Sequence, residues 1–278
     1  MRLNSFYIDD IIKTALLEDI NYIDTTTDYL IPVNQTSKAV MRAKASGVLC
    51  GAEIAARVFE LLDSDISVDI LKHDGHFLEN GDIIMEISGK TRTLLKGERT
   101  ALNLIQHMSG IATLTNECVK RVAKTSASIA DTRKTLPGLR ALQKYAVTVG
   151  GGKNHRFNLS DAAMLKDNHV DAGGGITNAV EALRKHLGHM VKIEVEVRNL
   201  EELKEALSAK VDVIMLDNMD LNTMAEAVKI TSGKAILEAS GGITLDSIEA
   251  VAKTGVDIIS VGALTHSVKA FDISMNII

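Results

Sequence analysis

A cluster of basic side chains in the middle of the chain offers the clearest chemistry. Eight basic residues fall between positions 133 and 166: Arg133, Lys134, Arg140, Lys144, Lys153, His155, Arg156 and Lys166. Guanidinium groups provide a planar fork for carboxylate or phosphate oxygens, and ammonium groups provide a compact charge. The whole chain has a formal net charge of −5, whereas nucleic-acid binders are usually basic. The cluster therefore predicts a small anionic ligand.

Not every member of the cluster is expected to bind this ligand. Arg140 and Lys144 lie four residues apart on an expected helix, which is typical of a solvated face. For Lys153 both interpretations stay open. His155 and Arg156 follow a triple glycine, which would let backbone amides and neighbouring cations approach a ligand closely. We expect the other basic residues, at the ends of apolar runs and beside the glycines, to form the anion site.

Two acidic residues, Glu196 and Asp217, end two consecutive apolar runs. Mg²⁺ beside a phosphorylated ligand typically uses one or two carboxylates plus ligand oxygens, so this pair predicts a magnesium site. The alternative is that both acids pair with the basic cluster. Glu194 lies in the same run as Glu196. We expect Glu196 to face the ligand, because it is nearer the end of the run, and Glu194 to point away.

Glycines follow two further apolar runs. The residues concerned are Ser240, Gly241 and Gly242 after one run, and Val261, Gly262 and Ala263 after the next. In β/α barrels a phosphate often binds on the last two strand–helix loops, where backbone amides hold it. These loops therefore predict a phosphate site. The triple glycines at 150–152 and 173–175 do not fit the GxGxxG pattern of a dinucleotide-binding loop.

Six short apolar runs would position these side chains. Each ends in polar or glycine residues and precedes a helical pattern: SIADTRK, AMLKDNH, VKIEVEV, VDVIMLDN, KAILEASGG and VDIISVGA. The last four have polar ends near 196, 217, 240 and 262, so they repeat every 21 to 23 residues. This alternation predicts a parallel α/β fold, and we favour a closed or nearly closed β/α barrel over an open doubly wound sheet. The carboxyl ends of parallel strands would bring the residues above to one rim.

The chain changes character near residue 98. Before it, residues 7–18 predict an amphipathic helix. Ser37–Leu49 and Gly81–Ile87 predict strands of a small α+β domain. A long helix is expected over Gly97–Lys124, where apolar residues recur at helical spacing.

These changes predict the domain organisation. We expect an N-terminal α+β sandwich domain at residues 1–100 and a catalytic α/β barrel at residues 101–265. The C-terminal segment, residues 266–278, is expected to pack back on the N-terminal domain.

Composition and the N-terminal sequence indicate the cellular compartment that we expect for the protein. Cys50 and Cys118 lack metal-binding spacing, so we expect two buried free thiols in a reducing compartment. The N-terminus lacks the basic start and apolar core of a signal peptide, and no apolar run approaches the roughly 20 residues of a membrane span. We therefore expect a soluble cytoplasmic protein without a nucleic-acid or membrane partner.

The central motifs resemble those of a known family. DTRKTLPGLR, AVTVGGGKNHR and LSDAAMLKDNH look like the signature of quinolinate phosphoribosyltransferases, and GERTALN, IEVEV, IMLDN, EASGGI and SVGALTHS extend the similarity over nearly the whole chain. The resemblance implies an N-terminal sandwich domain and an open α/β barrel, assembled as a homodimer or higher homo-oligomer with shared active sites. It also implies phosphoribosyl transfer from 5-phosphoribosyl 1-pyrophosphate to quinolinate. Loss of CO₂ would then give nicotinate mononucleotide for NAD synthesis.

The resemblance implies roles residue by residue. The residues that would bind quinolinate and the phosphoribosyl donor are Arg133, Lys134, Thr135, His155, Arg156 and Lys166. Arg99 of GERTALN would reach the site from the partner subunit. Glu196 and Asp217 would face the ribose hydroxyls, the pyrophosphate and Mg²⁺, and the two glycine-containing loops would hold the 5-phosphate. The expected catalytic residues are Lys134, Lys166, Glu196 and Asp217.

Three other functions share part of this pattern. A paralogue found with molybdate-transport systems has the same fold but typically lacks the lysine of LKDNH, here Lys166. A non-catalytic phosphometabolite-binding barrel would not need Glu196, Asp217 and the whole basic set together. A phosphoribosyltransferase for nicotinate, a mono-acid, would need fewer cations and no decarboxylation. We therefore favour quinolinate as the substrate.

Overall fold

The computed structural model describes residues 3–278, which form two compact units. The first unit comprises the described residues up to Asn116, together with Thr135–Gly151 and Ser267–Ile278. The second comprises Glu117–Lys134 and Gly152–His266. Both units are thus built from separated stretches of the chain. The domain limits expected at residues 100 and 265 stay a prediction.

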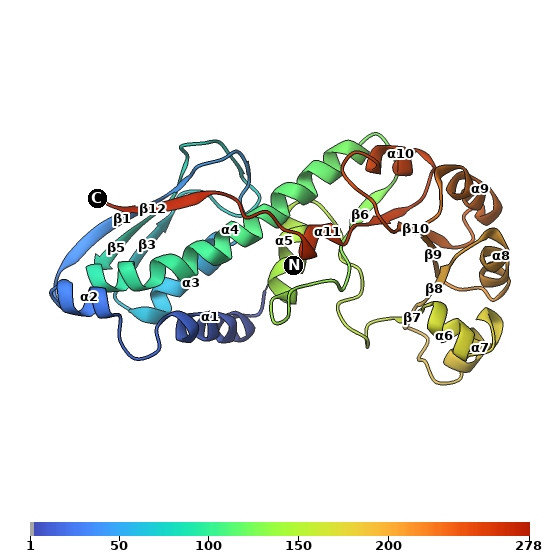
Figure 1. Cartoon of the computed structure of the whole chain (residues 1–278), viewed down its shortest axis with the longest axis horizontal. Helices are drawn as coiled ribbons and strands as arrows, with labels where there is room; N and C mark the ends of the chain where they lie inside the picture. The colour runs from blue at the N-terminus through green and yellow to red at the C-terminus, as the bar shows by residue number, and fades with distance from the viewer. Residues whose placement is uncertain (1–2) are drawn as a thin grey trace. The chain divides into compact units, whose positions relative to one another are not determined.

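The first unit is an α+β domain, as expected (Figure 1). Its helices are α1 (Ser5–Asp19), α2 (Thr25–Leu30), α3 (Ala52–Leu62), most of α4 (Thr91–Val122) and α5 (Arg140–Val149). Its strands are β1 (Thr36–Ala43), β2 (Gly47–Val48), β3 (Ser67–Ile70), β4 (Phe77–Leu78), β5 (Ile83–Lys90) and β12 (Ile273–Ile277). The larger sheet has the order β12-β1-β5-β3 and is antiparallel throughout, and β2 pairs with β4.

The long helix α4 begins earlier than expected. It starts at Thr91 rather than at Gly97, so the expected start was wrong by six residues. Gly97 lies inside the helix, where an added Cβ would come within 2.7 Å of the ring of Phe59 on α3. Because Phe59 is fully buried, the absence of a side chain at Gly97 permits close packing of α4 on α3. The glycine therefore serves packing and does not start the helix.

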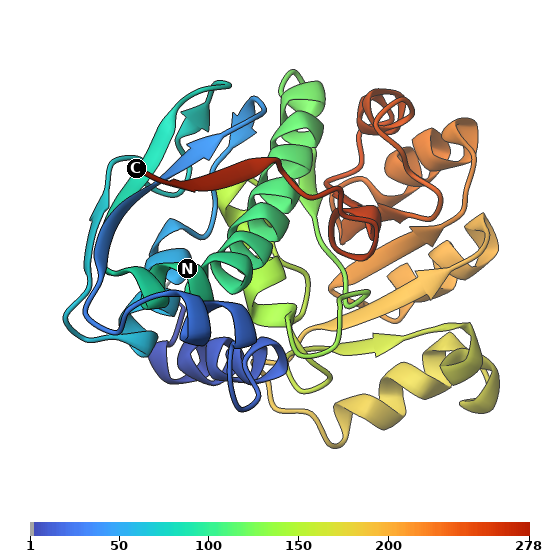
Figure 2. The ribbon, with the colours of Figure 1, turned by 60° about the vertical axis from the view of Figure 1, so that its left-hand side comes forward.

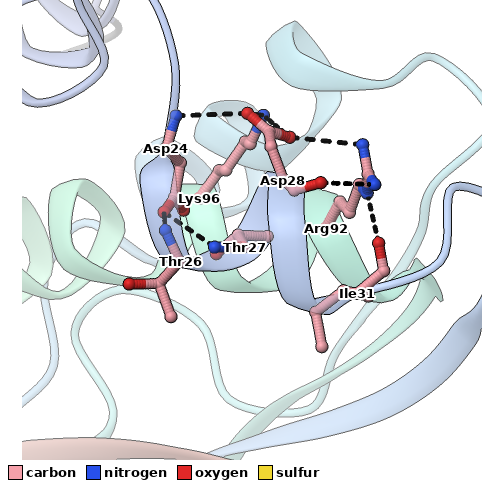
Figure 3. Close-up of polar contacts among 7 residues, drawn as sticks. All are labelled: Asp24, Thr26, Thr27, Asp28, Ile31, Arg92 and Lys96. Atoms are coloured by element: carbon pink, nitrogen blue, oxygen red, sulfur yellow. Dashed lines mark hydrogen bonds and ion pairs between the residues drawn. The ribbon is translucent and has the colours of Figure 1, made fainter.

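Helix α2 is tied to the first turns of α4 by charged side chains (Figure 3). Asp24 caps α2, because its Oδ1 accepts the backbone N–H of Thr27 at 2.9 Å. The carboxylate of Asp28 accepts hydrogen bonds from Lys96 Nζ at 2.7 and 2.9 Å and from Arg92 Nη1 at 3.3 Å. The N-terminal part of α4 is thereby held against α2 by groups that are each less than one quarter exposed.

The second unit is an open α/β barrel (Figures 1 and 2). Its strands are β6 (Ser128–Ala130), β7 (Ala163–Leu165), β8 (Ile193–Val197), β9 (Val213–Asp217), β10 (Ile236–Ser240) and β11 (Ile258–Ser260). They are parallel, in the order β6-β11-β10-β9-β8-β7. Its helices are α6 (Asp167–Ala172), α7 (Ile176–Arg184), α8 (Leu200–Ser208), α9 (Leu221–Thr231), α10 (Ile248–Lys253) and α11 (Ala263–His266). Each of the six apolar runs forms a strand, so the parallel α/β prediction is confirmed.

The barrel is open because β6 and β7 are its two edges. Within residues 3–278 no strand pairing joins these edges. Instead, the segment at Lys153 pairs with the outer edge of β6. Lys153 N–H donates to Ile129 O at 2.8 Å, and Asp131 N–H donates to Lys153 O at 3.1 Å. The backbone of Lys153 thus has a structural role that its side-chain charge did not predict.

Helix α5 corrects one expectation about the basic cluster. Lys144 is fully buried, so the solvated face expected for it was wrong. The reason is that α5 buries most of its surface, including Leu142 and Val147 on either side of Lys144. Arg140 is partly exposed, and its Nε donates to Thr135 Oγ1 at 2.9 Å within the same unit.

One expectation from composition is confirmed in the described residues. Cys50 and Cys118 are both buried free thiols. Burial raises the pKa of both, to about 11 for Cys118. From residue 3 onward, the structure contains no helix that combines the length and the apolar character needed to cross a membrane.

Candidate active site

A pocket of about 430 Å³ opens at the carboxyl ends of the barrel strands. The residues that line it all belong to the second unit: Thr132, Arg133, Lys134, His155, Arg156, Met164, Lys166, Glu196, Met215, Asp217 and Ser240. Parallel strands direct their carboxyl ends to one rim, which is why residues far apart in the chain meet here. Eight of the predicted site residues therefore lie around one cavity.

The other predicted site residues have different positions. Gly241 and Gly242 continue the chain beyond β10, and Val261, Gly262 and Ala263 follow β11, but none of the five lines the pocket itself. Thr135 and Arg99 belong to the first unit, and Arg99 is exposed on α4. Their roles at the site stay predictions.

The loop after β11 lies against Lys134. Lys134 O accepts a hydrogen bond from Thr265 Oγ1 at 2.9 Å, and Lys134 N–H donates to Thr132 Oγ1 at 3.0 Å. A Cβ added at Gly262 would come within 3.2 Å of Lys134 Cδ, which is tighter than ordinary contact. A Cβ at position 262 would require Lys134 and the nearby His266 ring to shift by a few tenths of an ångström, so the missing side chain of Gly262 leaves room for Lys134.

Basic groups make up a large part of the pocket lining. Arg156 Nη1 donates to Ala162 O at 2.9 Å, which fixes the direction of its guanidinium. Burial lowers the pKa of Arg156, and the nearby positive charge of Arg133 lowers it further. Two guanidinium groups that repel each other within one cavity would be stabilised by a bound anion.

Two carboxylates, Glu196 and Asp217, also line the pocket. Glu196 Oε2 lies 3.8 Å from Lys166 Nζ. Burial raises the pKa of Glu196; the charge of Lys166 opposes this rise, whereas the charge of Asp217 adds to it. Asp217 accepts a hydrogen bond from Asn218 Nδ2 at 2.9 Å. Two neighbouring carboxylates that repel each other at a pocket wall are a donor set that a hard divalent cation fits.

The expectation that Glu194 points away was wrong. Residues two apart along a strand share a face, so Glu194 and Glu196 both point inward from β8. Glu194 is only 5% exposed and lies deeper in the barrel than Glu196. The same spacing places Glu238, 2% exposed, below Ser240 on β10. Strict two-residue periodicity would have predicted both buried acids from the sequence.

These buried acids surround His155. Its Nε2 lies 3.0 Å from Glu194 Oε2 and 3.6 Å from Glu238 Oε1. Within residues 3–278, Oε1 of Glu194 and Oε1 of Glu238 have no hydrogen-bond partner. Burial raises the pKa of Glu238 to about 7, and the charge of Glu194 contributes to the rise. Close to neutral pH Glu238 is therefore protonated for part of the time.

The cluster of His155, Glu194 and Glu238 has the residue types and the spacing of a metal site. The second nitrogen of the histidine argues against one. His155 Nδ1 accepts the backbone N–H of Arg156 at 2.8 Å, so the proton of the neutral ring lies on Nε2. A protonated Nε2 donates to Glu194 and has no lone pair for a metal ion. The cluster is therefore a hydrogen-bonded support for His155, whose ring faces the pocket.

Profiles of one family cover almost all of the chain. The C-terminal domain profile described as "Quinolinate phosphoribosyl transferase, C-terminal domain" matches residues 111–276. The corresponding N-terminal domain profile matches residues 24–109.

Individual relatives agree with these profiles over their full lengths. A protein of Bacillus subtilis (strain 168) with the name "Probable nicotinate-nucleotide pyrophosphorylase (carboxylating)" is 46% identical over 275 residues, 99% of this chain and 95% of the relative. The nicotinate-nucleotide pyrophosphorylase (carboxylating) of Mycobacterium leprae is 43% identical over 277 residues, 96% of each chain. The crystal structure of NadC from Streptococcus pyogenes superposes with a TM-score of 0.96 at 42% identity, and the match covers 99% of this chain and 98% of that one. The chain belongs to the quinolinate phosphoribosyl transferase family.

Proposed function

We propose that this chain is a decarboxylating quinolinate phosphoribosyltransferase of NAD biosynthesis. It transfers the 5-phosphoribosyl group of 5-phosphoribosyl 1-pyrophosphate to the ring nitrogen of quinolinate. The products are nicotinate mononucleotide, pyrophosphate and CO₂. Membership of the family and the names of its relatives support this activity.

The pocket composition is the observation that carries the proposal. Both substrates are polyanions, and the pocket presents Arg133, Lys134, Arg156 and Lys166 to them. A mono-acid acceptor would leave part of this positive charge without a partner. Arginine forks suit the two carboxylates of quinolinate, and the exposed lysines suit pyrophosphate oxygens. The basic set thus favours a dicarboxylic acceptor.

Glu196 and Asp217 would act on the ribose side of the reaction. The bond from C1 of the ribose to pyrophosphate oxygen breaks as positive charge develops on the sugar, and nearby carboxylates stabilise that charge. When bound, Mg²⁺ would be held by Glu196 and Asp217 together with pyrophosphate oxygens, and it would neutralise charge on the departing group. The mutual repulsion of the two acids supports this assignment.

The basic residues would position both the acceptor and the donor. The ring nitrogen forms its bond to C1 while Lys134 and Lys166 hold the substrates in line, so positioning accounts for much of the rate. The resulting pyridinium accepts the electron pair when the 2-carboxylate leaves as CO₂, and a proton then replaces it on the ring carbon. Both nitrogens of His155 already bond within the protein, so we assign His155 to supporting the pocket wall and Arg156 to direct binding.

The glycine-containing loops would hold the 5-phosphate. Residues 240–242 and 261–263 have small side chains or none, except for Val261, which is buried. Small residues let a phosphate approach the backbone N–H groups closely. The Lys134 side chain lies close enough to Gly262 that an added Cβ would come within 3.2 Å of its Cδ, which supports placing phosphate and cation together.

We also propose a homodimer in which Arg99 acts on the site of the partner subunit. Its exposure on α4 supports an intermolecular contact. Because this role depends on two chains, mixing two inactive variants tests it.

A direct assay tests the proposed reaction. Purified protein is incubated with quinolinate, 5-phosphoribosyl 1-pyrophosphate and Mg²⁺, and nicotinate mononucleotide and CO₂ are both measured. Nicotinate is the comparison substrate, and a Lys166→Ala variant controls for contaminating activity. We expect product and CO₂ in equal amounts from quinolinate alone. Equal turnover of nicotinate, or no product from a folded protein with either acid, would refute the proposal.

A further inference from the structure

Asn218, directly after β9, has an unusual backbone conformation. Its φ is +52°, in the left-handed region, and among residues 3–278 only Lys210 and Ser232 are other non-glycine residues with positive φ. Left-handed backbone is costly for most side chains, although asparagine tolerates it better than most. In this conformation the Asn218 N–H donates to Ser240 O at 3.0 Å. The turn therefore ties the end of β9 to the end of β10.

The side chain of Asn218 lies between Asp217, which lines the pocket, and Gly241, which follows β10. Its Nδ2 donates to Asp217 Oδ2 at 2.9 Å, which limits rotation of that carboxylate. On its other side lies Gly241, whose φ is +99°. A Cβ added at Gly241 would overlap Asn218 Oδ1 and lie 2.5 Å from its Cγ. The glycine loop thus rests directly on the amide of Asn218.

We propose that Asn218 is a positioning residue that holds the Asp217 carboxylate and the Ser240–Gly242 loop at a fixed separation. This inference rests on the proposed function, in which Asp217 serves the ribose and pyrophosphate and the loop serves the 5-phosphate. Both groups belong to one ligand, 5-phosphoribosyl 1-pyrophosphate, whose ribose ring limits the distance between them, so the two subsites must keep a matching separation. The amide of Asn218 lies against both subsites, because its Nδ2 bonds to Asp217 and its Oδ1 is packed beside Gly241.

The chemistry explains why an asparagine suits this position. Position 218 needs an N–H donor for a carboxylate, a short side chain that lies under Gly241, and a residue type that tolerates positive φ. Aspartate would match the shape but would replace the donor by a second negative charge beside Asp217. Glycine would keep the backbone conformation without strain but would remove both side-chain contacts. These two substitutions separate the side-chain role from the backbone role.

The first test compares Asn218→Gly with the wild type. We expect an unchanged thermal midpoint, because glycine adopts positive φ without strain. We expect a KM for 5-phosphoribosyl 1-pyrophosphate raised on the order of tenfold, as for loss of a hydrogen bond to a charged group. The KM for quinolinate should stay within about twofold, because its binding groups are untouched. A merely structural asparagine would instead change the thermal midpoint or both KM values together.

The matched control is Ser232→Gly. Ser232 has a φ of +47°, is exposed and ends α9 away from the pocket. The same exchange at this residue should leave both KM values unchanged.

Asn218→Asp gives a second test that does not depend on added backbone freedom. It should weaken binding of 5-phosphoribosyl 1-pyrophosphate at least as much as Asn218→Gly does.

Calorimetric binding of 5-phosphoribosyl 1-pyrophosphate with Mg²⁺ separates this inference from the proposed function. If the wild type binds the donor but forms no product, the proposed reaction fails, and the affinities of the Asn218 variants still test the positioning role. If both Asn218 variants bind the donor as tightly as the wild type, the positioning role is wrong whatever the turnover. A wild type that does not bind the donor would overturn both.

Discussion

Replacing Glu238 by glutamine should make the protein more stable at alkaline pH but not at acidic pH. Glu238 is 2% exposed, and burial together with the charge of Glu194 raises its pKa from 4.5 to about 7. The folded state therefore binds this proton more tightly than the unfolded state does, so stability is greatest below pH 4.5 and falls as pH rises toward 7. At about 1.36 kcal/mol per pH unit, the full loss is about 3 kcal/mol.

Glutamine has the shape of glutamic acid and stays neutral at every pH in this range. It also offers N–H donors to Glu194 Oε1, which has no hydrogen-bond partner in the described part of the chain. The difference in free energy of unfolding, Glu238→Gln minus wild type, should therefore be close to zero near pH 4.5. It should increase to about 1–3 kcal/mol in favour of the variant at pH 8.

The assay is urea unfolding followed by far-ultraviolet circular dichroism, because the chain has no tryptophan for fluorescence. Measurements at pH 5, 6, 7 and 8 give the pH dependence, and Glu249→Gln is the matched control. Glu249 is about half exposed on α10 and pairs with Lys253 at 2.7 Å, an interaction that lowers its pKa. The control should gain no stability with rising pH. The reasoning about Glu238 fails if its variant shows the same flat difference as the control.

Three further outcomes are expected. Lys134→Ala and Lys166→Ala should each lower kcat on the order of a hundredfold or more, as measured by nicotinate mononucleotide formation, while thermal midpoints stay near wild type because both side chains are exposed. Mixing inactive Arg99→Ala with inactive Lys134→Ala subunits should restore about a quarter of wild-type activity if sites are shared in a dimer, and no recovery after subunit exchange would exclude the trans role. Asp24→Ala should cost about 1 kcal/mol of unfolding free energy through loss of the α2 cap, with kcat unchanged; an unaltered stability would contradict the capping role.

Much of the barrel was predictable because the sequence pattern of each strand lies within one short segment. Each apolar run ends in a polar residue at the rim, so the amino-acid pattern alone assigns Lys166, Glu196 and Asp217 to one edge of the sheet. Continuous apolar strands alternating with helices determine this arrangement almost by themselves. Pairing of the edges is not a local property, so the apolar pattern by itself did not distinguish a closed barrel from the open one, and only the family resemblance implied the open form.

Other features depend on contacts that no single segment reveals. Lys144 has the position of a solvated residue on its own helix, but the packing of α5 buries it. Gly97 resembles a helix boundary until Phe59 is found against it. Asn218 was visible in the IMLDN motif, but its role depends on Gly241, more than 20 residues away in the chain. Glu194 is different, since consistent use of the two-residue period would have placed it correctly.

The open barrel has a consequence for aggregation. A closed barrel has no free strand edges, whereas an open one leaves two rows of backbone N–H and C=O groups on which another chain could pair. Here both edge strands, β6 and β7, have three residues, while β8, β9 and β10 have five. The segment at Lys153 additionally occupies the outer groups of β6. Short edges and this covering segment limit intermolecular sheet growth. Substitutions that loosen the residues around Lys153 should therefore expose the outer edge of β6 and lower the solubility of the protein.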